Sequence, residues 1–214
     1  MTIIAAADGS ALGNPGPAGW AWYVSDDCWA AGGWPESTNN RGELTAVLEL
    51  LRATAAAGLA GEDLLIQADS QYVINSLTKW RHGWKRRGWR KADGKPVLNE
   101  DLMRALDEAL AGRQVRFEWV RGHVGHPMNE AADTRARAAA TAYQRGSAVP
   151  GGPGWPGARA SAQSADGPIA GGGASRTGAG AAGPSEAPTE APTAVPGATA
   201  ARRARLRAER GTLF

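Results

Sequence analysis

The chain has 214 residues, of which 43% are hydrophobic, and its formal net charge is +3. A single cysteine, Cys28, excludes an internal disulfide and fits a reducing compartment. No apolar run approaches membrane-spanning length and the first residues lack the pattern of a secretory signal, so we expect a cytoplasmic protein without membrane contact.

Composition divides the chain near residue 145. Residues 1–145 hold eight of the nine tryptophans and all three histidines, with 17 acidic and 17 basic residues. From Gly146 onward Gly, Ala, Pro, Ser and Thr dominate, a composition that buries too little apolar surface to offset chain entropy. We therefore expect one folded domain over 1–145 and a disordered tail over 146–214, whose Ala/Arg-rich stretch 200–210 is an unstructured basic end.

The first elements of the domain are predicted to be three antiparallel strands and a helix. Residues 2–7 read as a short buried strand that ends in a Gly/Pro/Asn-rich turn, and 20–24 and 29–33 follow as a hairpin. Apolar residues then recur with helical spacing from Leu44 to Leu51, which predicts an amphipathic helix capped by Thr38 or Asn39.

The following elements complete a mixed sheet. The run 64–68 predicts a fourth strand, and the strand-helix-strand order implies a right-handed parallel crossover beside the first strand. A helix from about Ser70 continues into a basic Trp-rich segment broken by Gly83 and Gly88, another helix starts after Asn99, 115–120 forms a fifth strand, and a Gly-rich loop leads to a last helix. The predicted class is α/β: a five-stranded mixed sheet, three antiparallel strands plus parallel strands, flanked by helices.

Four acidic residues, Asp8, Glu43, Asp69 and Asp133, stand where strands are expected to end or helices to begin. Asp8 and Asp69 have no basic residue three or four positions away, unlike carboxylates in solvated ion pairs. The crossover puts these two at the carboxyl ends of neighbouring parallel strands, where open sheets bind ligands. Glu43 taken alone is equally explained by the dipole of its helix. Together the four acids predict a divalent-cation site.

Several segments occur in the order seen in a known family: Asp8-Gly9-Ser10 with the turn 13–17, then 38–44, 69–73 and 122–127. Over residues 1 to about 143 the chain resembles bacterial type 1 ribonuclease H. The resemblance implies a ribonuclease H-like fold and an endonuclease that hydrolyses the RNA strand of RNA/DNA hybrids, leaving 5′-phosphate and 3′-hydroxyl ends. It implies two Mg²⁺ ions, replaceable by Mn²⁺, held by Asp8, Glu43, Asp69 and Asp133. It also implies a catalytic loop histidine, His123, and a monomer that binds the hybrid duplex.

The resemblance further implies contacts with both nucleic-acid strands. Amides are expected at the 2′-hydroxyls, a DNA phosphate is expected beside two helix starts, and the basic segment is expected along the backbone. These residues are, in turn, Asn14, Asn39, Asn40 and Gln71; Thr38 and Asn99; and Trp80, Trp84, Lys85, Arg86 and Arg87. Structural alternatives remain for several of them: Asn14 as a turn residue, Thr38 and Asn99 as helix caps, and the two tryptophans as partners that pack on each other.

Other functions stay open at this point. A DNA-strand integrase or junction resolvase gathers acids around two metals on a similar fold, and a catalytically silent RNA/DNA hybrid-binding module would retain the binding residues. A metal-binding protein independent of nucleic acid would leave the basic Trp-rich segment unexplained. Zinc bound by His123 and His126 is disfavoured because no cysteine lies nearby.

Overall fold

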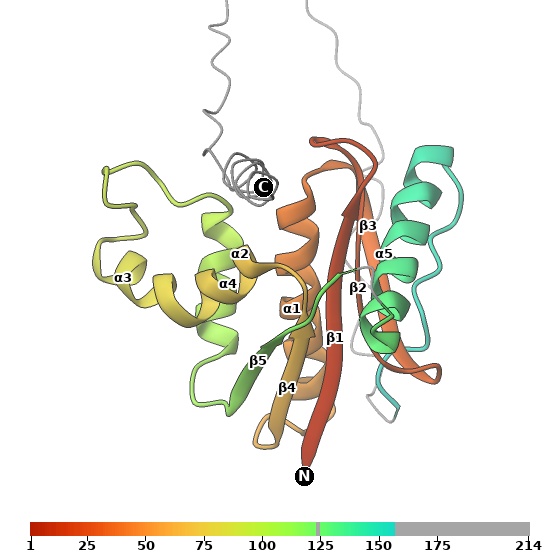
Figure 1. Ribbon diagram of the computed structural model, residues 1–214, viewed down its shortest axis with the longest axis horizontal. Helices are drawn as coiled ribbons and strands as arrows, with labels where there is room; N and C mark the ends of the chain where they lie inside the picture. Colours follow the sequence, from red (N-terminus) through yellow and green to blue (C-terminus); the bar gives the residue numbers. More distant parts are fainter. Residues whose placement is uncertain (123–124, 157–214) are drawn as a thin grey trace, which may run out of the picture. The chain divides into compact units, whose positions relative to one another are not determined.

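A mixed five-stranded sheet with helices on both faces forms the folded part of the chain (Figure 1). The computed structural model describes residues 1–122 and 125–156. The strands are β1 (Thr2–Ala11), β2 (Gly16–Ser25), β3 (Cys28–Ser37), β4 (Asp63–Ala68) and β5 (Val115–Trp119). The helices are α1 (Asn39–Ala56), α2 (Gln71–Asn75), the π-helical turn η1 (Ser76–Trp80), α3 (Arg81–Arg86), α4 (Glu100–Ala109) and α5 (Pro127–Arg145).

The strand order is β3-β2-β1-β4-β5, and it confirms the predicted topology. The pairs β1–β2 and β2–β3 are antiparallel, whereas β1–β4 and β4–β5 are parallel. Pairing of β1 with β4 stops at Ala6, but β1 remains paired with β2 as far as Ala11. Asp8 therefore lies inside β1. This corrects the expectation that it stands at the end of the strand. It still projects at the edge where the parallel pairing with β4 has stopped.

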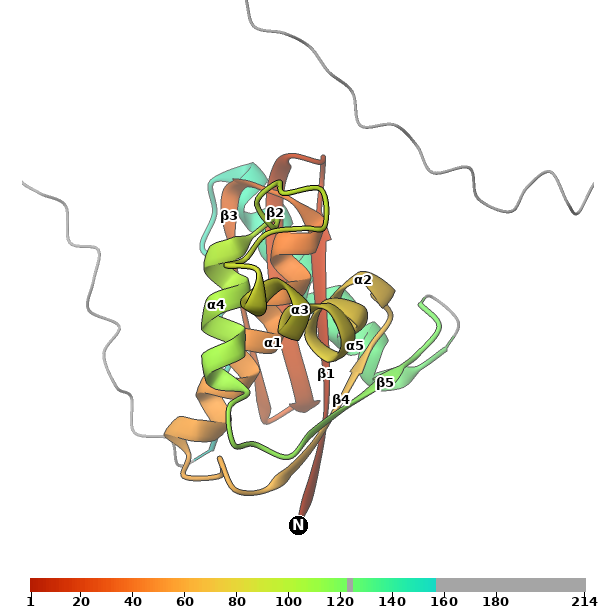
Figure 2. The same cartoon turned by 90° about the vertical axis from the view of Figure 1, so that its left-hand side faces the viewer.

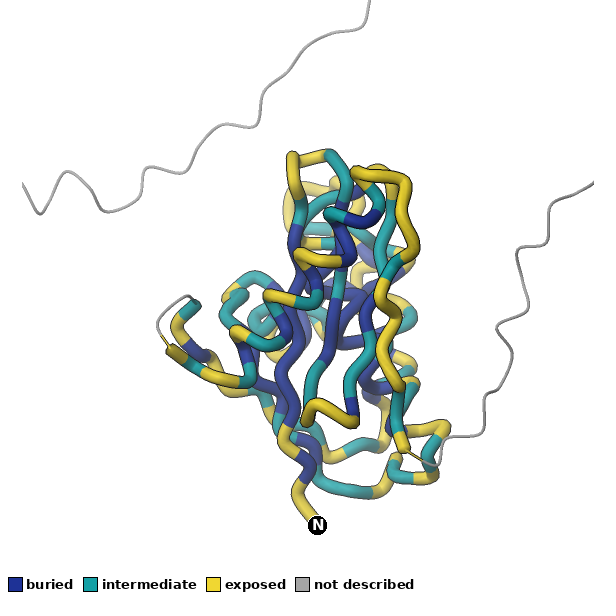
Figure 3. The backbone as a smooth tube through the Cα atoms, turned by 90° about the vertical axis from the view of Figure 1, so that its right-hand side faces the viewer, coloured by how far each residue is buried: buried dark blue, intermediate teal, exposed yellow. Residues whose placement is uncertain are grey.

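Helices cover both faces of the sheet, with the interior continuous between them. The apolar stripe of α1, including Leu44, Val47 and Leu51, is buried as predicted, and α4 lies alongside α1 (Figure 2). On the opposite face α5 contacts β1, β2 and β3 through small buried residues such as Ala136 and Ala139. Buried backbone runs through the central strands, and exposed backbone is concentrated in the connections (Figure 3). The sheet positions two of the acidic residues, because Asp8 lies in β1 and Asp69 directly follows β4.

The basic Trp-rich segment forms two short helical pieces beside α4. Ser70 caps α2, because its hydroxyl oxygen accepts a hydrogen bond of 3.3 Å from the Val73 N–H. The expectation that Gly83 breaks the helix is wrong, since Gly83 lies within α3 and the helix ends at Arg86. Burial of Trp84 against the main core explains this, because the apolar contact holds the turn that contains Gly83.

The folded part continues past the predicted boundary at residue 145. After α5 the chain returns to the free edge of β3, where Ala31 N–H donates to Gly151 O (3.1 Å) and Gly154 N–H donates to Trp29 O (3.0 Å). The ring of Trp155 lies 6.0 Å from that of Trp22, centroid to centroid. One aromatic residue in a Gly/Pro-rich stretch thus anchors the segment 147–156. Residues 157–214 of the predicted tail lie outside the described residues. Within the described ranges, no helix combines the length and apolarity needed to cross a membrane.

Candidate active site

Three carboxylates from separate elements meet at one edge of the sheet. Asp8 comes from β1, Glu43 from the second turn of α1, and Asp69 from the residue directly after β4. One carboxylate oxygen from each lies within 4.8 Å of the other two. The parallel pairing of β1 and β4 brings the two aspartates together, and packing of α1 on the sheet adds the glutamate.

Close backbone approach sets this geometry. A Cβ atom at Gly9 would lie 2.6 Å from the Gly42 carbonyl carbon and would also collide with the Glu43 nitrogen. The first turns of α1 therefore rest directly on β1, which carries Glu43 to Asp8. A side chain at Gly122 would collide with the Asp69 carboxylate, so the chain after β5 crosses close to that acid. A bulkier residue at either glycine would displace a carboxylate.

Hydrogen bonds orient the carboxylates. The Gly9 N–H donates to Asp8 Oδ1 (2.7 Å), and Asn39 Nδ2 donates to Glu43 Oε1 (2.8 Å). Asn39 is itself held, because its backbone N–H donates to Asn14 Oδ1 (3.3 Å). The other glutamate oxygen, Glu43 Oε2, is buried and has no hydrogen-bond partner among the described residues. Such an orphaned acceptor is costly unless a ligand satisfies it.

The surroundings of Asp8 and Glu43 favour their protonated forms when no cation is present. Burial raises the pKa of Asp8 to about 8, and the charges of Asp69, Asp133 and Glu43 add to the effect against the opposing Gly9 N–H. Burial likewise raises the pKa of Glu43 to about 7; the nearby Ser70 hydroxyl opposes this shift, and the charge of Asp69 adds to it. Desolvated carboxylates that repel one another and leave one oxygen unsatisfied fit a hard divalent cation such as Mg²⁺.

The carboxylate hollow around these acids has a volume of about 190 Å³. Asp133, half-buried on α5, lines it from the opposite side, although its carboxylate is not within the 4.8 Å group. The described residues that line it are Asp8, Gly9, Ser10, Ala11, Asn39, Glu43, Asp69, Asp133 and Arg137.

Arg137 corrects one expectation, namely that the acids converge without a basic neighbour. It lines the same hollow from α5, one helical turn after Asp133. The four-residue spacing between the two was a readable signal of this proximity. The spacing of Asn39 and Glu43 was a similar signal, and it would have identified Asn39 as a partner of the glutamate.

The structure describes one of the two loop histidines. His123, the predicted catalytic histidine, lies outside the described residues. His126 immediately precedes α5 as the expected helix-entry residue, and its side chain makes no capping hydrogen bond. Its Nδ1 atom is buried without a partner among the described residues.

The predicted polar nucleic-acid contacts occupy varied settings. Asn40 and Gln71 are exposed near the carboxylate hollow, whereas the amides of Asn14 and Asn39 already make the hydrogen bonds described above. Thr38 caps α1, because its Oγ1 accepts from the Arg41 N–H at 3.3 Å. Asn99 precedes α4 in the left-handed conformation (φ 53°), and its side chain makes no capping bond, so the helix-cap alternative fails for this residue.

Some side chains of the basic segment are buried or paired with an acid, so fewer of them are available to contact nucleic acid than the sequence indicates. Trp80 remains 41% exposed, but the Trp84 ring is buried and lies 5.7 Å from that of Trp80, so the two rings pack together, as the structural alternative for this pair stated. Asp107 of α4 accepts hydrogen bonds from Arg81 (3.0 Å) and Lys85 (2.6 Å). The sequence placed a single acid, Asp93, among these cations; α4 supplies a second. The remaining predicted cations, Arg86 and Arg87, are exposed.

Comparisons with known proteins agree with this architecture. A family model described as RNase H matches residues 2–141. The chain is 56% identical over 153 residues to a ribonuclease H of Tropheryma whipplei (strain Twist), with 72% of this chain and 93% of that protein covered. It is 45% identical over 144 residues to a ribonuclease H of Paracoccus denitrificans, covering 64% and 90% of the respective chains.

Among solved structures, the chain is similar to LC9-RNase H1, described as a type 1 RNase H with the type 2 active-site motif. The TM-score is 0.56 at 32% identity, with 71% of this chain and 77% of that chain covered. The matched sequence, the sheet topology and the acidic edge of the sheet lead to one conclusion: the chain belongs to the ribonuclease H family and is a ribonuclease H enzyme.

Proposed function

We propose that the chain is an endonuclease that hydrolyses the RNA strand of RNA/DNA hybrids by two-metal-ion catalysis, leaving 5′-phosphate and 3′-hydroxyl ends. The observation that carries this proposal is the meeting of Asp8, Glu43 and Asp69 within 4.8 Å in a partly desolvated hollow. Asp133 completes the ligand set from the opposite wall.

The residues of the chain perform distinct tasks in this reaction. Asp8 and Asp69 extend from rigid strand positions and hold the cations, which when bound lower the pKa of water and stabilise charge on the departing oxygen. Asn39 fixes the orientation of Glu43 and leaves its second oxygen for ligation. His123 assists proton movement or product release. Mg²⁺ is the proposed ion, and Mn²⁺ can replace it.

Selection of the hybrid requires contacts with 2′-hydroxyls on one strand and with deoxyribose phosphates on the other. Asn40 and Gln71 are exposed and lie within two residues of Asn39 and Asp69, which line the carboxylate hollow, so they are suited to the first task. Asn14 and Asn39 are proposed to contact the 2′-hydroxyls together with them. Thr38 and Asn99 are proposed to hold the DNA phosphate. Asn99 suits this role because its side chain is not used as a helix cap.

The basic segment is proposed to follow the nucleic-acid backbone through Trp80, Lys85, Arg86 and Arg87. Lys85 is still 61% exposed in its side chain despite its ion pair with Asp107, so it can share its charge with a phosphate. The protein is proposed to act as a monomer on the hybrid duplex.

The decisive experiment is cleavage of a strand-labelled RNA/DNA hybrid with and without Mg²⁺. Double-stranded RNA, duplex DNA and an Asp69→Asn variant serve as parallel reactions. Metal-dependent cutting confined to the RNA strand, and absent in the variant, is expected. Cutting of duplex DNA would favour an integrase or resolvase, and binding without cutting would favour a silent hybrid-binding module.

A further inference from the structure

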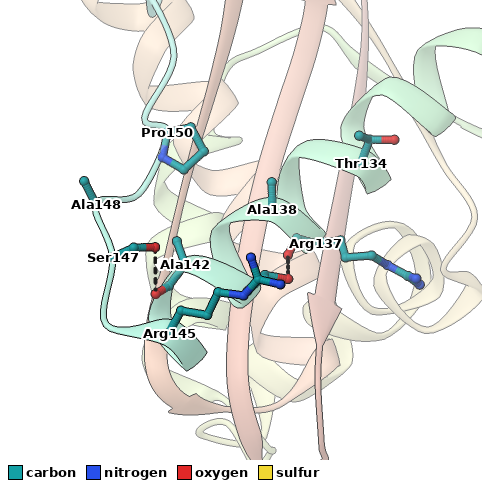
Figure 4. Close-up of a pocket in the computed structure, with 9 residues that line it drawn as sticks. Thr134, Arg137, Ala138, Ala142, Arg145, Ser147, Ala148 and Pro150 are labelled. Atoms are coloured by element: carbon teal, nitrogen blue, oxygen red, sulfur yellow. Dashed lines mark hydrogen bonds between the residues drawn. The ribbon is translucent and has the colours of Figure 1, made fainter.

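A second hollow, larger than the carboxylate hollow, lies on the outer face of α5. It has a volume of about 440 Å³ and is bounded by α5 from Thr134 to Arg145 and by the segment 147–150 (Figure 4). We call it the α5 hollow. Arg137 lines both hollows, so the two adjoin at this residue.

The described residues that line the α5 hollow include two arginines and no acid, so the hollow is positively charged. Arg137 and Arg145 are exposed, and neither guanidinium group makes a hydrogen bond or an ion pair with a described residue; the backbone oxygen of Arg137 accepts a hydrogen bond from Thr141 Oγ1 (2.9 Å). Arg135 behaves differently, because it donates to Asp26 (2.9 Å) and lies over the rings of Tyr23 and Trp29. The chain thus neutralises one arginine of α5 and leaves two along the hollow.

The shape of the hollow admits a polymer backbone. Between Arg137 and Arg145, the described residues of α5 that line the hollow are Ala138, Thr141 and Ala142, all of which have small side chains. Figure 4 shows the Arg145 side chain lying along the surface of α5, and the Arg137 side chain leaving the helix on the side away from Pro150. Eight residues of α-helix correspond to about 12 Å, so the two arginines are far enough apart to contact different phosphates of one strand.

The hollow is a fixed part of the fold. Ser147 closes the end of α5, with its backbone N–H donating to Ala142 O at 2.9 Å. Val149 packs with the buried alanine cluster between α5 and the sheet, and Gly151 O accepts a hydrogen bond from β3. The wall formed by 147–150 is therefore held from both sides and offers a preformed surface.

We propose that the α5 hollow is a backbone-binding subsite for the RNA strand of the hybrid, on one side of the cleaved phosphate. The inference rests on the proposed function, because the strand whose phosphate enters the carboxylate hollow is the strand that continues past Arg137. Charge complementarity and this continuity identify a phosphodiester backbone as the occupant. Arg145 then makes the outermost contact, outside the catalytic centre.

The test compares Arg145→Gln with a matched control, Arg116→Gln, in the full chain. Arg116 is an exposed arginine on β5 that has no ion pair with a described residue, so the change in net charge is the same. Affinity for a labelled hybrid is measured without metal over a range of salt concentrations. Loss of one phosphate contact should lower the log-log salt slope by about 0.7 to 0.9 in the Arg145 variant only.

Turnover supplies the second measurement. In a strand with one short ribonucleotide block, which fixes the position of cutting, Arg145→Gln should raise KM several-fold on long duplexes and leave kcat unchanged. The wild-type protein and Arg145→Gln should cleave duplexes shortened on the side that reaches Arg145 with equal KM. Arg145→Lys should restore the wild-type log-log salt slope of hybrid binding. An unaltered slope in Arg145→Gln, or an equal decrease in the control, would overturn the subsite. Failure of the wild-type protein to cut any hybrid would instead overturn the proposed function.

Discussion

Trp155 lies beyond the boundary that composition indicates, yet it should contribute measurably to stability. In Trp155→Ala the half-buried indole beside Trp22 is lost. Full burial of a large apolar side chain is worth about 1.5–3 kcal/mol, and an aromatic pair adds about 0.5–1.5 kcal/mol. Because Trp155 is only half-buried, we expect the free energy of unfolding to fall by about 2 kcal/mol. This corresponds to a decrease in Tm of about 4–8 °C for a domain of this size.

The assay is urea unfolding of the full-length variant, with thermal unfolding beside it. Hybrid cleavage at low temperature should be unchanged, since Trp155 does not line the carboxylate hollow. A free energy of unfolding equal to that of the wild type would refute the packing argument and would return the segment 147–156 to the tail.

Two glycines of the same segment provide a matched pair. Both have positive φ, +82° at Gly152 and +75° at Gly154, so alanine strains the backbone at either position. Only at Gly152 would the new Cβ also lie 2.6 Å from the Trp29 ring, whereas nothing lies within 4 Å at Gly154. Gly152→Ala should therefore cost about 1–3 kcal/mol more than Gly154→Ala, and equal costs would mean that the segment does not rest on β3.

Three further outcomes are expected. The pKa of Asp8 is raised to about 8 and that of Glu43 to about 7, from ordinary values of 3.8 and 4.5, so the folded, metal-free protein retains protons that the unfolded chain has released. Stability in EDTA should thus fall as pH rises from about 5 to 8, and Asp8→Asn should flatten this dependence in urea titrations; an equally steep curve would contradict the burial argument. Asn39→Asp places a like charge against Glu43, so kcat should fall at least about tenfold with a smaller change in KM, and intact turnover would show that this hydrogen bond is dispensable. Asp107→Ala removes the acid that holds two cations of the basic segment, so the free energy of unfolding should fall by about 1–3 kcal/mol, while hybrid affinity at low salt is retained or increased because Lys85 is released; weaker binding would contradict the latter expectation.

Local patterns in the sequence predict the order of elements and the identity of the acids. Apolar spacing in α1, the strand-helix-strand order and the positions of Asp8 and Asp69 are properties of neighbouring residues, so the sequence alone supports a mixed sheet with a cation site at its edge. The order of several motifs along the chain additionally indicates which protein family the sequence resembles.

Tertiary structure decides which residues share these surroundings. The pairing of Asp107 with the basic segment and the packing of Trp155 against Trp22 join residues that are far apart in the chain. Such contacts depend on strand register and helix rotation, which composition and periodicity do not specify. Burial of Trp84 has the same origin, because this tryptophan of a basic stretch packs into the main apolar core.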